Sequence, residues 1–89
     1  MEIDSKYAFA YNNRGNVYRD KGDVDRALAD YNEAIRLDPK YAVAYNNRAN
    51  AYRGKGELDR AIADYNDAIR VDPKYADAYV CLLYTSRCV

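Results

Sequence analysis

The sequence repeats after 34 residues, and this period constrains the fold more than any other feature. Shifting the chain by 34 positions aligns residues 7–40 with residues 41–74, and 25 of the 34 aligned pairs are identical. A third copy begins at Tyr75 and follows the pattern as far as Tyr79. A period of about 20 to 50 residues is typical of arrays in which each small unit packs against the next one.

Each copy has the hydrophobic spacing of two helices. In the first half of the second copy, Tyr45, Ala49 and Tyr52 follow i, i+4, i+7 spacing and would share one side of a helix. The second half has a fuller apolar stripe, which consists of Leu58, Ala61, Ile62, Tyr65, Ala68 and Ile69. The same spacing occurs one period earlier, so each copy predicts a pair of helices.

Turn-forming residues separate these helices. Gly22 and Gly56 interrupt the chain between the two halves of each copy. Asp-Pro at 38–39 and 72–73 ends each copy, because proline cannot continue a helix. A hairpin of two such helices leaves apolar surface that a neighbouring hairpin must cover. We therefore predict an all-α fold, an α-solenoid of antiparallel helix hairpins.

The period divides the chain into four segments. Residues 7–40 and 41–74 are expected to form two complete repeats, and residues 75–89 to contain the start of the first helix of a third. Residues 1–6, with the sequence MEIDSK, align with the segment IRLDPK that ends the first repeat. They are therefore either the last turn of a preceding repeat or a short lead-in.

The end of the chain departs from the period. If the third copy continued, residues 80–86 would resemble NNRANAY, but their sequence is VCLLYTS. We therefore expect that residues 81–89 are not native coding sequence of the repeat array. Cys81 and Cys88 both lie in this tail, at a spacing that fits no common zinc motif, and we assign them no role.

The recurring residues resemble the tetratricopeptide repeat (TPR), a family of stacked helical hairpins. The first copy matches with Tyr11-x2-Arg14-Gly15-x2-Tyr18, Ala27-x3-Tyr31 and Pro39, and the second with Tyr45-x2-Arg48-Ala49-x2-Tyr52, Ala61-x3-Tyr65 and Pro73. The resemblance covers about residues 7–79 and departs from the family at Arg14 and Arg48, where Leu is usual. An Arg can lay its methylene groups on apolar surface and keep its charge in water, so we expect the fold to be unchanged. Tyr also replaces the Trp and Phe of the family, which adds hydroxyls that need partners.

Charged residues follow the helical period as well. Arg26 and Asp30, and likewise Arg60 and Asp64, stand four residues apart in the second helix of each copy. Opposite charges at this spacing can pair on the solvated side of a helix. We interpret these residues as an exposed outer surface without a catalytic role.

Composition argues against catalysis and against several classes of partner. The chain has no His, and its Ser and Thr residues lie only near its ends, so we expect no enzyme activity and no cofactor or metal. The 14 Lys and Arg balance the 14 Asp and Glu without a charged block, which argues against nucleic-acid binding. No apolar run approaches the roughly 20 residues of a membrane helix, and no signal peptide precedes the repeats. The sequence favours a cytoplasmic protein.

We expect the function to lie on the side of the first helix of each copy that is opposite the tyrosines. The family resemblance implies that this side lines a concave groove that holds peptides. The candidate groove residues are Phe9, Asn12, Asn13, Asn16, Arg19, Val43, Asn46, Asn47, Asn50 and Arg53. Asparagine amides both donate and accept, so they can pair with the backbone of a peptide of any sequence. The alternative is that these polar side chains are merely solvated.

The resemblance also bears on one known binding mode of the family. One TPR subclass binds the C-terminal carboxylates of heat-shock chaperones through a clamp of three cations and two asparagines. Asn16 and Asn47 match the two asparagines, whereas Asn12, Asp77 and Cys81 stand at the positions of the cations. We therefore predict that this chain does not form a carboxylate clamp.

The leading hypothesis is a protein–protein interaction module that binds a peptide segment of a partner protein in this groove. Two alternatives stay open at this point. The repeats could be structural spacers of a longer array, or the fragment could associate with itself through an uncapped apolar end. A peptide screen distinguishes the interaction module from the structural spacer. Light scattering at several concentrations tests self-association.

Overall fold

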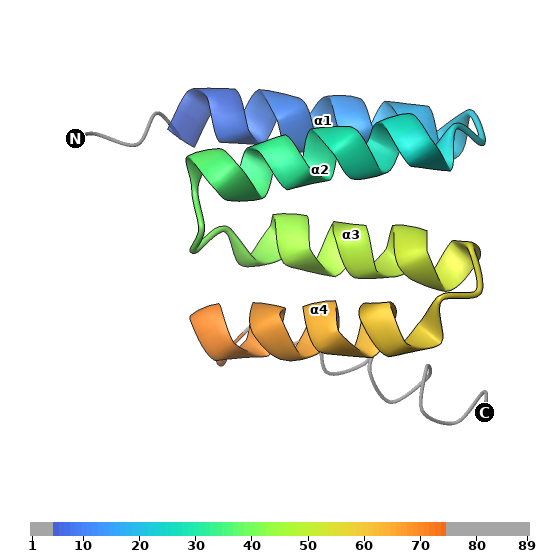
Figure 1. Cartoon of the computed structure of the whole chain (residues 1–89). Helices are drawn as coiled ribbons and strands as arrows, with labels where there is room; N and C mark the ends of the chain where they lie inside the picture. The colour runs from blue at the N-terminus through green and yellow to red at the C-terminus, as the bar shows by residue number, and fades with distance from the viewer. Residues whose placement is uncertain (1–4, 75–89) are drawn as a thin grey trace.

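The structure is a computed structural model that describes residues 5–74 and contains four helices in this range (Figure 1). They are α1 (Ser5–Asp20), α2 (Val24–Leu37), α3 (Ala42–Gly54) and α4 (Leu58–Val71), with no strand between Ser5 and residue 74. Of the six residues expected to form the end of a preceding repeat or a lead-in, Ser5 and Lys6 belong to α1 and residues 1–4 lie outside the described residues. The expectations for the third repeat, the tail and its two cysteines also lie outside the described residues.

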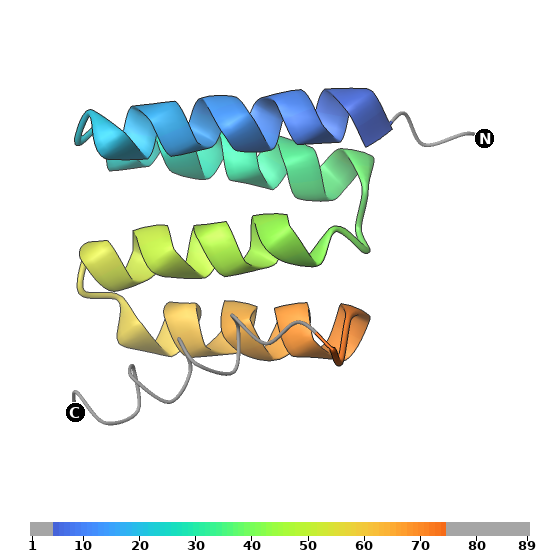
Figure 2. The ribbon, with the colours of Figure 1, turned by 180° about the vertical axis from the view of Figure 1, so that it is seen from behind.

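The helices form two hairpins that pack side by side. Helices α1 and α2 pack together, as do α3 and α4, and α2 joins the hairpins by packing against α3. The turns within the two hairpins lie at one end of the molecule and the connection from α2 to α3 at the other, so successive helices are antiparallel (Figures 1 and 2). The predicted all-α solenoid of helix hairpins is therefore confirmed. No helix among the described residues is long and apolar enough to span a bilayer.

The turns within the hairpins depend on glycine. Gly22 has a φ of 87° and Gly56 a φ of 83°, a left-handed conformation that other residues adopt only at a cost. The residue after each glycine is acidic and occupies the N-cap position, directly before the next helix. Asp23 caps α2 by accepting a bond of 3.3 Å from the backbone N–H of Arg26, whereas Glu57 makes no such cap for α4.

Each hairpin closes around a buried tyrosine. Tyr31 in α2 and Tyr65 in α4 are both 0% exposed, and each faces a small residue of the preceding helix. In the first hairpin that residue is Gly15, where an added Cβ would lie 2.7 Å from Cε1 of Tyr31. In the second it is Ala49, which packs with Tyr65. The small residues of the repeat thus allow a large ring to fill the space between paired helices.

The interpretation of Asp30 and Asp64 as solvated surface residues is wrong. Asp30 is 5% exposed and Asp64 4% exposed, and each accepts two hydrogen bonds from an arginine of the other helix in its hairpin. Arg14 donates from Nε and Nη2 to Asp30 at 2.8 Å, and Arg48 donates to Asp64 at 2.8 and 2.7 Å. Arginine stands where the family usually has Leu because it neutralises a buried carboxylate, which would otherwise be costly.

Two polar contacts join the second hairpin to the first. The Nη1 atom of Arg48 donates to Oδ1 of Asn32 in α2 at 2.8 Å, so this arginine bonds to side chains of both α2 and α4. Near the other end of the same interface, the Nζ atom of Lys55 lies 3.1 Å from Oδ1 of Asp25. The hydrogen bond and the charge of Asp25 raise the pKa of Lys55. These contacts fix how the two hairpins align, and therefore how α1 and α3 lie relative to each other.

Candidate functional site

The ten residues predicted for the groove come from two helices that contact each other, α1 and α3. Helix α1 carries Phe9, Asn12, Asn13, Asn16 and Arg19, and helix α3 carries Val43, Asn46, Asn47, Asn50 and Arg53. Phe9 is 57% exposed and Asn13 is also exposed. Six of the others are half-buried, and only Asn12 and Asn46 are buried. Eight of the ten side chains are therefore at least partly accessible on the first helices of the two repeats.

The two buried asparagines contribute to packing. Asn12 is 2% exposed, and its Oδ1 accepts a hydrogen bond of 2.9 Å from Nδ2 of Asn47. This bond ties α1 to α3 across the repeat boundary. Asn46 is 5% exposed, and its Oδ1 has no partner among residues 5–74. One period after Asn47 the sequence has Cys81 instead of the asparagine that the repeat would place there.

Buried tyrosines orient the asparagines at the middle of each first helix. The hydroxyl of Tyr31 donates to Oδ1 of Asn16 at 2.5 Å, and the hydroxyl of Tyr65 donates to Oδ1 of Asn50. A buried hydroxyl needs such a partner. Because each Oδ1 accepts a bond from inside its hairpin, each amide is left with Nδ2 as its donor to a ligand. Burial also raises the pKa of Tyr31, so this hydroxyl keeps its proton at neutral pH.

Sequence reasoning missed the tyrosine hydroxyls as groups that position the site. A signal was present, since Tyr replaces the Phe of the family at both positions and an Asn precedes it by 15 residues in each copy. Helical spacing alone does not pair these residues, because they lie on different helices of a hairpin. The pairing requires the antiparallel register that the structure provides.

The charged members of the set are Arg19 and Arg53, each near the end of its helix. Both are half-buried, and Nη1 of Arg19 is buried without a partner among the described residues. The site thus combines amide donors, two guanidinium groups and the exposed ring of Phe9. These groups can donate hydrogen bonds to a peptide with many acceptor groups. Proton transfer at neutral pH most often uses His, and also Asp, Glu, Lys, Tyr or Cys, none of which is among the ten residues. Within residues 5–74, no three side chains of His, Cys, Asp or Glu gather to hold a metal ion.

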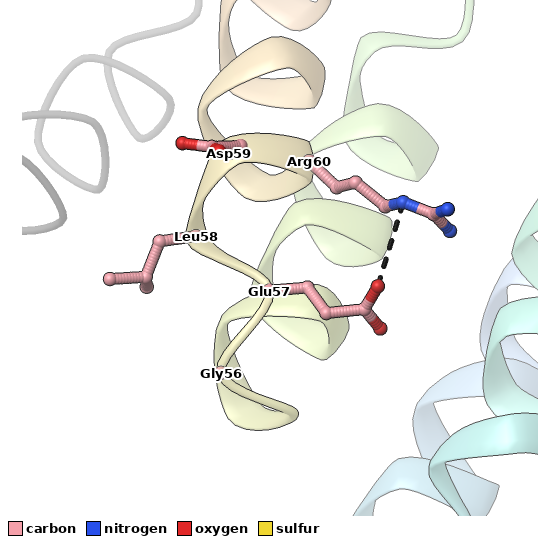
Figure 3. Close-up of a pocket in the computed structure, with 5 residues that line it drawn as sticks. All are labelled: Gly56, Glu57, Leu58, Asp59 and Arg60. Atoms are coloured by element: carbon pink, nitrogen blue, oxygen red, sulfur yellow. Dashed lines mark ion pairs between the residues drawn. The ribbon is translucent and has the colours of Figure 1, made fainter.

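A surface hollow of about 380 Å³ lies at the start of α4 (Figure 3). The described residues that line it are Gly56, Glu57, Leu58, Asp59 and Arg60. Oε1 of Glu57 lies 3.5 Å from Nε of Arg60, and these two side chains point the same way in Figure 3. A helix N-terminus can bind an anion, but the carboxylates of Glu57 and Asp59 disfavour one here. We assign no ligand to this hollow.

Comparison with known proteins identifies the family. A model described as TPR repeat matches residues 15–56, and one described as Tetratricopeptide repeat matches residues 42–75. The first TPR of Spaghetti (RPAP3), solved with the HSP90 peptide SRMEEVD, aligns with a TM-score of 0.91 and 30% identity over 93% of this chain and 68% of that one. This chain belongs to the tetratricopeptide repeat family. A search of curated protein sequences found no match to this TPR chain.

Other solved TPR domains are similarly close in structure. The TPR2B domain of yeast Sti1, in a pHsp70 complex, has a TM-score of 0.89 and 32% identity over 93% of this TPR chain and 66% of that one. The Sgt2 TPR domain from Aspergillus fumigatus has a TM-score of 0.84 and 28% identity over 88% of this chain and 52% of that one. Two of the three neighbours were thus solved with heat-shock protein ligands.

Proposed function

We propose that this TPR chain is a non-catalytic protein-interaction module that binds a peptide segment of a partner protein along α1 and α3. The observation that carries the proposal is the pair of Asn16 and Asn50 amides, each held by a buried tyrosine of its own hairpin. The two amides occupy the same position of successive repeats. The structurally similar first and second TPRs of Spaghetti (RPAP3) were solved bound to the HSP90 peptide SRMEEVD, which supports peptide binding as the function.

The groove residues favour a ligand with hydrogen-bond acceptors. The Nδ2 groups of Asn16 and Asn50 can donate to the backbone carbonyls of an extended peptide. Arg19 and Arg53 add positive charge, which favours acidic side chains or further carbonyls at that end of the groove. The exposed ring of Phe9 offers an apolar contact that can select among side chains. The ligand class we propose is a partly acidic, extended peptide with an apolar residue that can reach Phe9.

The mode of binding we propose differs from a carboxylate clamp. Asn12 stands where that clamp has its first lysine, and the Nδ2 of Asn47 already donates to Asn12. The peptide SRMEEVD and the same peptide with an amidated C-terminus test this point by fluorescence anisotropy. We expect the two peptides to bind equally weakly. A preference of about tenfold or more for the free carboxylate would contradict the absence of a clamp.

The groove itself is tested with a phage-displayed library of random peptides, followed by titration of synthetic hits. The groove variant is Phe9→Ser/Asn13→Ala, because both side chains are exposed and their loss should leave the fold intact. The matched control is Tyr7→Ser, which changes a 61% exposed side chain on the opposite side of α1 from Phe9. We expect the groove variant to weaken the hits by about tenfold, or about 1.4 kcal/mol, and the control to leave them unchanged.

Two results would contradict the proposal. The first is a screen without hits, which would favour the spacer interpretation. The second is a set of hits that the groove variant does not weaken. The variants Asn16→Ala and Asn50→Ala are unsuitable as a primary test, since each removes the partner of a buried tyrosine hydroxyl and would lower stability as well as binding.

A further inference from the structure

Two arginines of the groove differ from the other arginines of the structure because they have no acidic partner. Eight arginines lie in the part of the chain that the structure describes. Six of them pair with an Asp or Glu side chain, namely Arg14, Arg26, Arg36, Arg48, Arg60 and Arg70. Within residues 5–74, Arg19 and Arg53 make no ion pair. They occupy the same position of successive repeats, so the unpaired guanidinium group is a repeated feature of the groove.

The helix dipole alone would account for a cation in the last turn of a helix, but it does not account for burial. Arg36 and Arg70 lie in the last turns of α2 and α4, and their side chains are 66% exposed and paired with an acid. Arg19 and Arg53 lie in the last turns of α1 and α3, but both are half-buried. Nη1 of Arg19 is also buried without a partner in the described part of the chain. Partial burial of an unpaired charge costs free energy, which a bound anion would offset.

The guanidinium group of Arg19 lies near the amide that the groove presents. Asn16 precedes Arg19 by three residues in α1, and its Oδ1 accepts a hydrogen bond from the hydroxyl of Tyr31. Burial raises the pKa of Tyr31 and the charge of Arg19 opposes this rise, so the guanidinium group lies close to that hydroxyl. The same residue types recur at Asn50 and Arg53. Because α1 and α3 contact each other and run in the same direction, both arginines lie at the end of the groove next to the turns within the hairpins (Figures 1 and 2).

We propose that this end of the groove is a subsite for a phosphorylated side chain of the partner peptide. The subsite rests on the proposed function and names the group that the two arginines select. A phosphate monoester carries a charge of about −1.5 to −2 at pH 7 and three strong acceptor oxygens. Arg19 and Arg53 together supply a matching positive charge, and guanidinium groups bind phosphate with paired hydrogen bonds. A single carboxylate would neutralise only one of the two arginines.

The two repeats contribute unequally to the subsite. Asp20 follows Arg19 and is exposed, and its carboxylate would repel a phosphate group. The second repeat has Gly54 at the matching position, where an added Cβ would have nothing within 4 Å. A phosphate can therefore approach Arg53 without meeting a carboxylate like that of Asp20. We expect Arg53 to contribute more to phosphate binding than Arg19.

The groove also sets the distance between the phosphate and an apolar side chain. Phe9 and Arg19 are ten residues apart in α1, as are Val43 and Arg53 in α3. A helix rises about 1.5 Å per residue, which places about 15 Å between the members of each pair along the helix axis. An extended peptide covers this distance with four or five residues, at about 3.3 Å per residue. The expected ligand therefore has an apolar side chain four or five residues from the phosphorylated one.

The test uses the full 89-residue chain and labelled synthetic peptides that contain one leucine and one phosphoserine. The two residues are placed two to seven positions apart, in both orders, with alanine and glycine elsewhere. Two further series carry serine or glutamate in place of phosphoserine, and fluorescence anisotropy measures all affinities. We expect the tightest binding at a separation of four or five residues. There phosphoserine should bind about tenfold more tightly than serine and about threefold more tightly than glutamate.

Variants assign this preference to the arginines. Arg53→Gln keeps a long polar side chain and breaks no ion pair among residues 5–74, and it should lower the preference for phosphoserine over serine about threefold, with a smaller effect of Arg19→Gln. The matched control is Arg26→Gln, which makes the same change of net charge at a 70% exposed side chain of α2 and should leave the preference unchanged. Asp20→Asn should raise the affinity for phosphoserine peptides about threefold, because it removes a repelling charge. The ratio of the phosphoserine and serine affinities separates contact with the phosphate from a general loss of stability.

Three outcomes would overturn the subsite. The first is equal binding of phosphoserine and serine peptides that the groove variant Phe9→Ser/Asn13→Ala still weakens, a result that would leave the proposed function in place. The second is a preference for phosphoserine that Arg26→Gln lowers as much as Arg53→Gln does. The third is equal affinity at every separation, because the peptide would then not span the groove from the apolar residues to the arginines.

The absence of binding by every peptide would count against the proposed function, and inorganic phosphate alone then tests the arginines. The Nε–H signals of Arg19 and Arg53 are followed by NMR during titration with phosphate, with chloride at equal ionic strength as the reference. Saturable shifts with phosphate alone would support the subsite. Signals that do not move, or that move equally with chloride, would overturn the subsite as well.

Discussion

The pair of Arg48 and Asp64 offers a sharp test of what holds the second hairpin together. The substitution Asp64→Asn keeps the shape of the side chain but removes its charge. Arg48 now donates two bonds of 2.7 and 2.8 Å to the Asp64 carboxylate. The Oδ1 of an Asn can accept one of them, but its NH2 cannot accept the other, so Arg48 loses one bond and the charge of its partner and keeps its bond to Asn32. We expect the variant to be folded but clearly less stable than the parent chain.

The size of the loss follows from the exposure of the two side chains. The Asp64 side chain is 6% exposed and the Arg48 side chain 20%. Removing one partner of a fully buried ion pair costs about 3–5 kcal/mol, whereas an exposed pair contributes about 0.2–1 kcal/mol. Because one-fifth of Arg48 reaches water, the expected loss is about 2–3 kcal/mol. For a domain of this size that lowers Tm by about 8–24 °C.

The first repeat contains the matched control. Asp30 accepts the same two bonds from Arg14, but the Arg14 side chain is 58% exposed and can be hydrated when its partner loses its charge. We therefore expect Asp30→Asn to lower Tm clearly less than Asp64→Asn does. Thermal and urea unfolding followed by circular dichroism measure both variants against the parent chain.

Equal losses for Asp30→Asn and Asp64→Asn, or no measurable loss for Asp64→Asn, would refute the argument from exposure. A double substitution, Arg48→Leu/Asp64→Leu, separates charge burial from packing. Replacing a buried pair with apolar residues is often neutral or stabilising, so we expect most of the loss to be recovered. The loss that persists would contain the bond from Arg48 to Asn32 in the neighbouring hairpin and the contact of the Arg48 guanidinium with the ring of Tyr45, 5.6 Å from the ring centroid.

Three further predictions concern glycine, tyrosine and the contact between hairpins. Gly15→Ala should lower Tm because the new Cβ would lie 2.7 Å from the fully buried ring of Tyr31, whereas Gly54→Ala, with nothing within 4 Å of its Cβ, should raise stability by about 0.5–1 kcal/mol. Tyr31→Phe should cost about 1 kcal/mol at neutral pH through its lost hydrogen bond. Burial raises the pKa of Tyr31, so its contribution is present below about pH 10 and lost as pH rises through the folded pKa, and the variant should lose less stability in an alkaline titration. Lys55→Met should destabilise the chain at low salt, and this difference should shrink towards 1 M salt as the Debye length falls to about 3 Å.

The helices and their order could be predicted because local rules determine them. Gly22 and Gly56 do mark the turns within the hairpins, and their positive φ angles show why glycine is needed there. The small residues Gly15 and Ala49 do face large rings, as close packing of paired helices requires. Each of these predictions depends on residues within one hairpin and on the period, which a single sequence contains.

Contacts between helices were harder to predict. Helical spacing paired Asp30 with the arginine four residues before it, but its partner is Arg14 on the facing helix, 16 residues away. The exposure of a side chain depends on the antiparallel register, which spacing along one helix does not contain. The groove set illustrates the same limit, since Asn12 and Asn46 share the polar character of Asn13 but are buried. The available signal was the recurrence of the Arg–Asp and Asn–Tyr pairs at the same separation in both copies.

The two repeats also show that the environment of a residue, and not its identity, determines what it contributes. Arg14 and Arg48 make the same bidentate bonds, yet their exposures differ almost threefold because only Arg48 has a neighbouring helix in front of it.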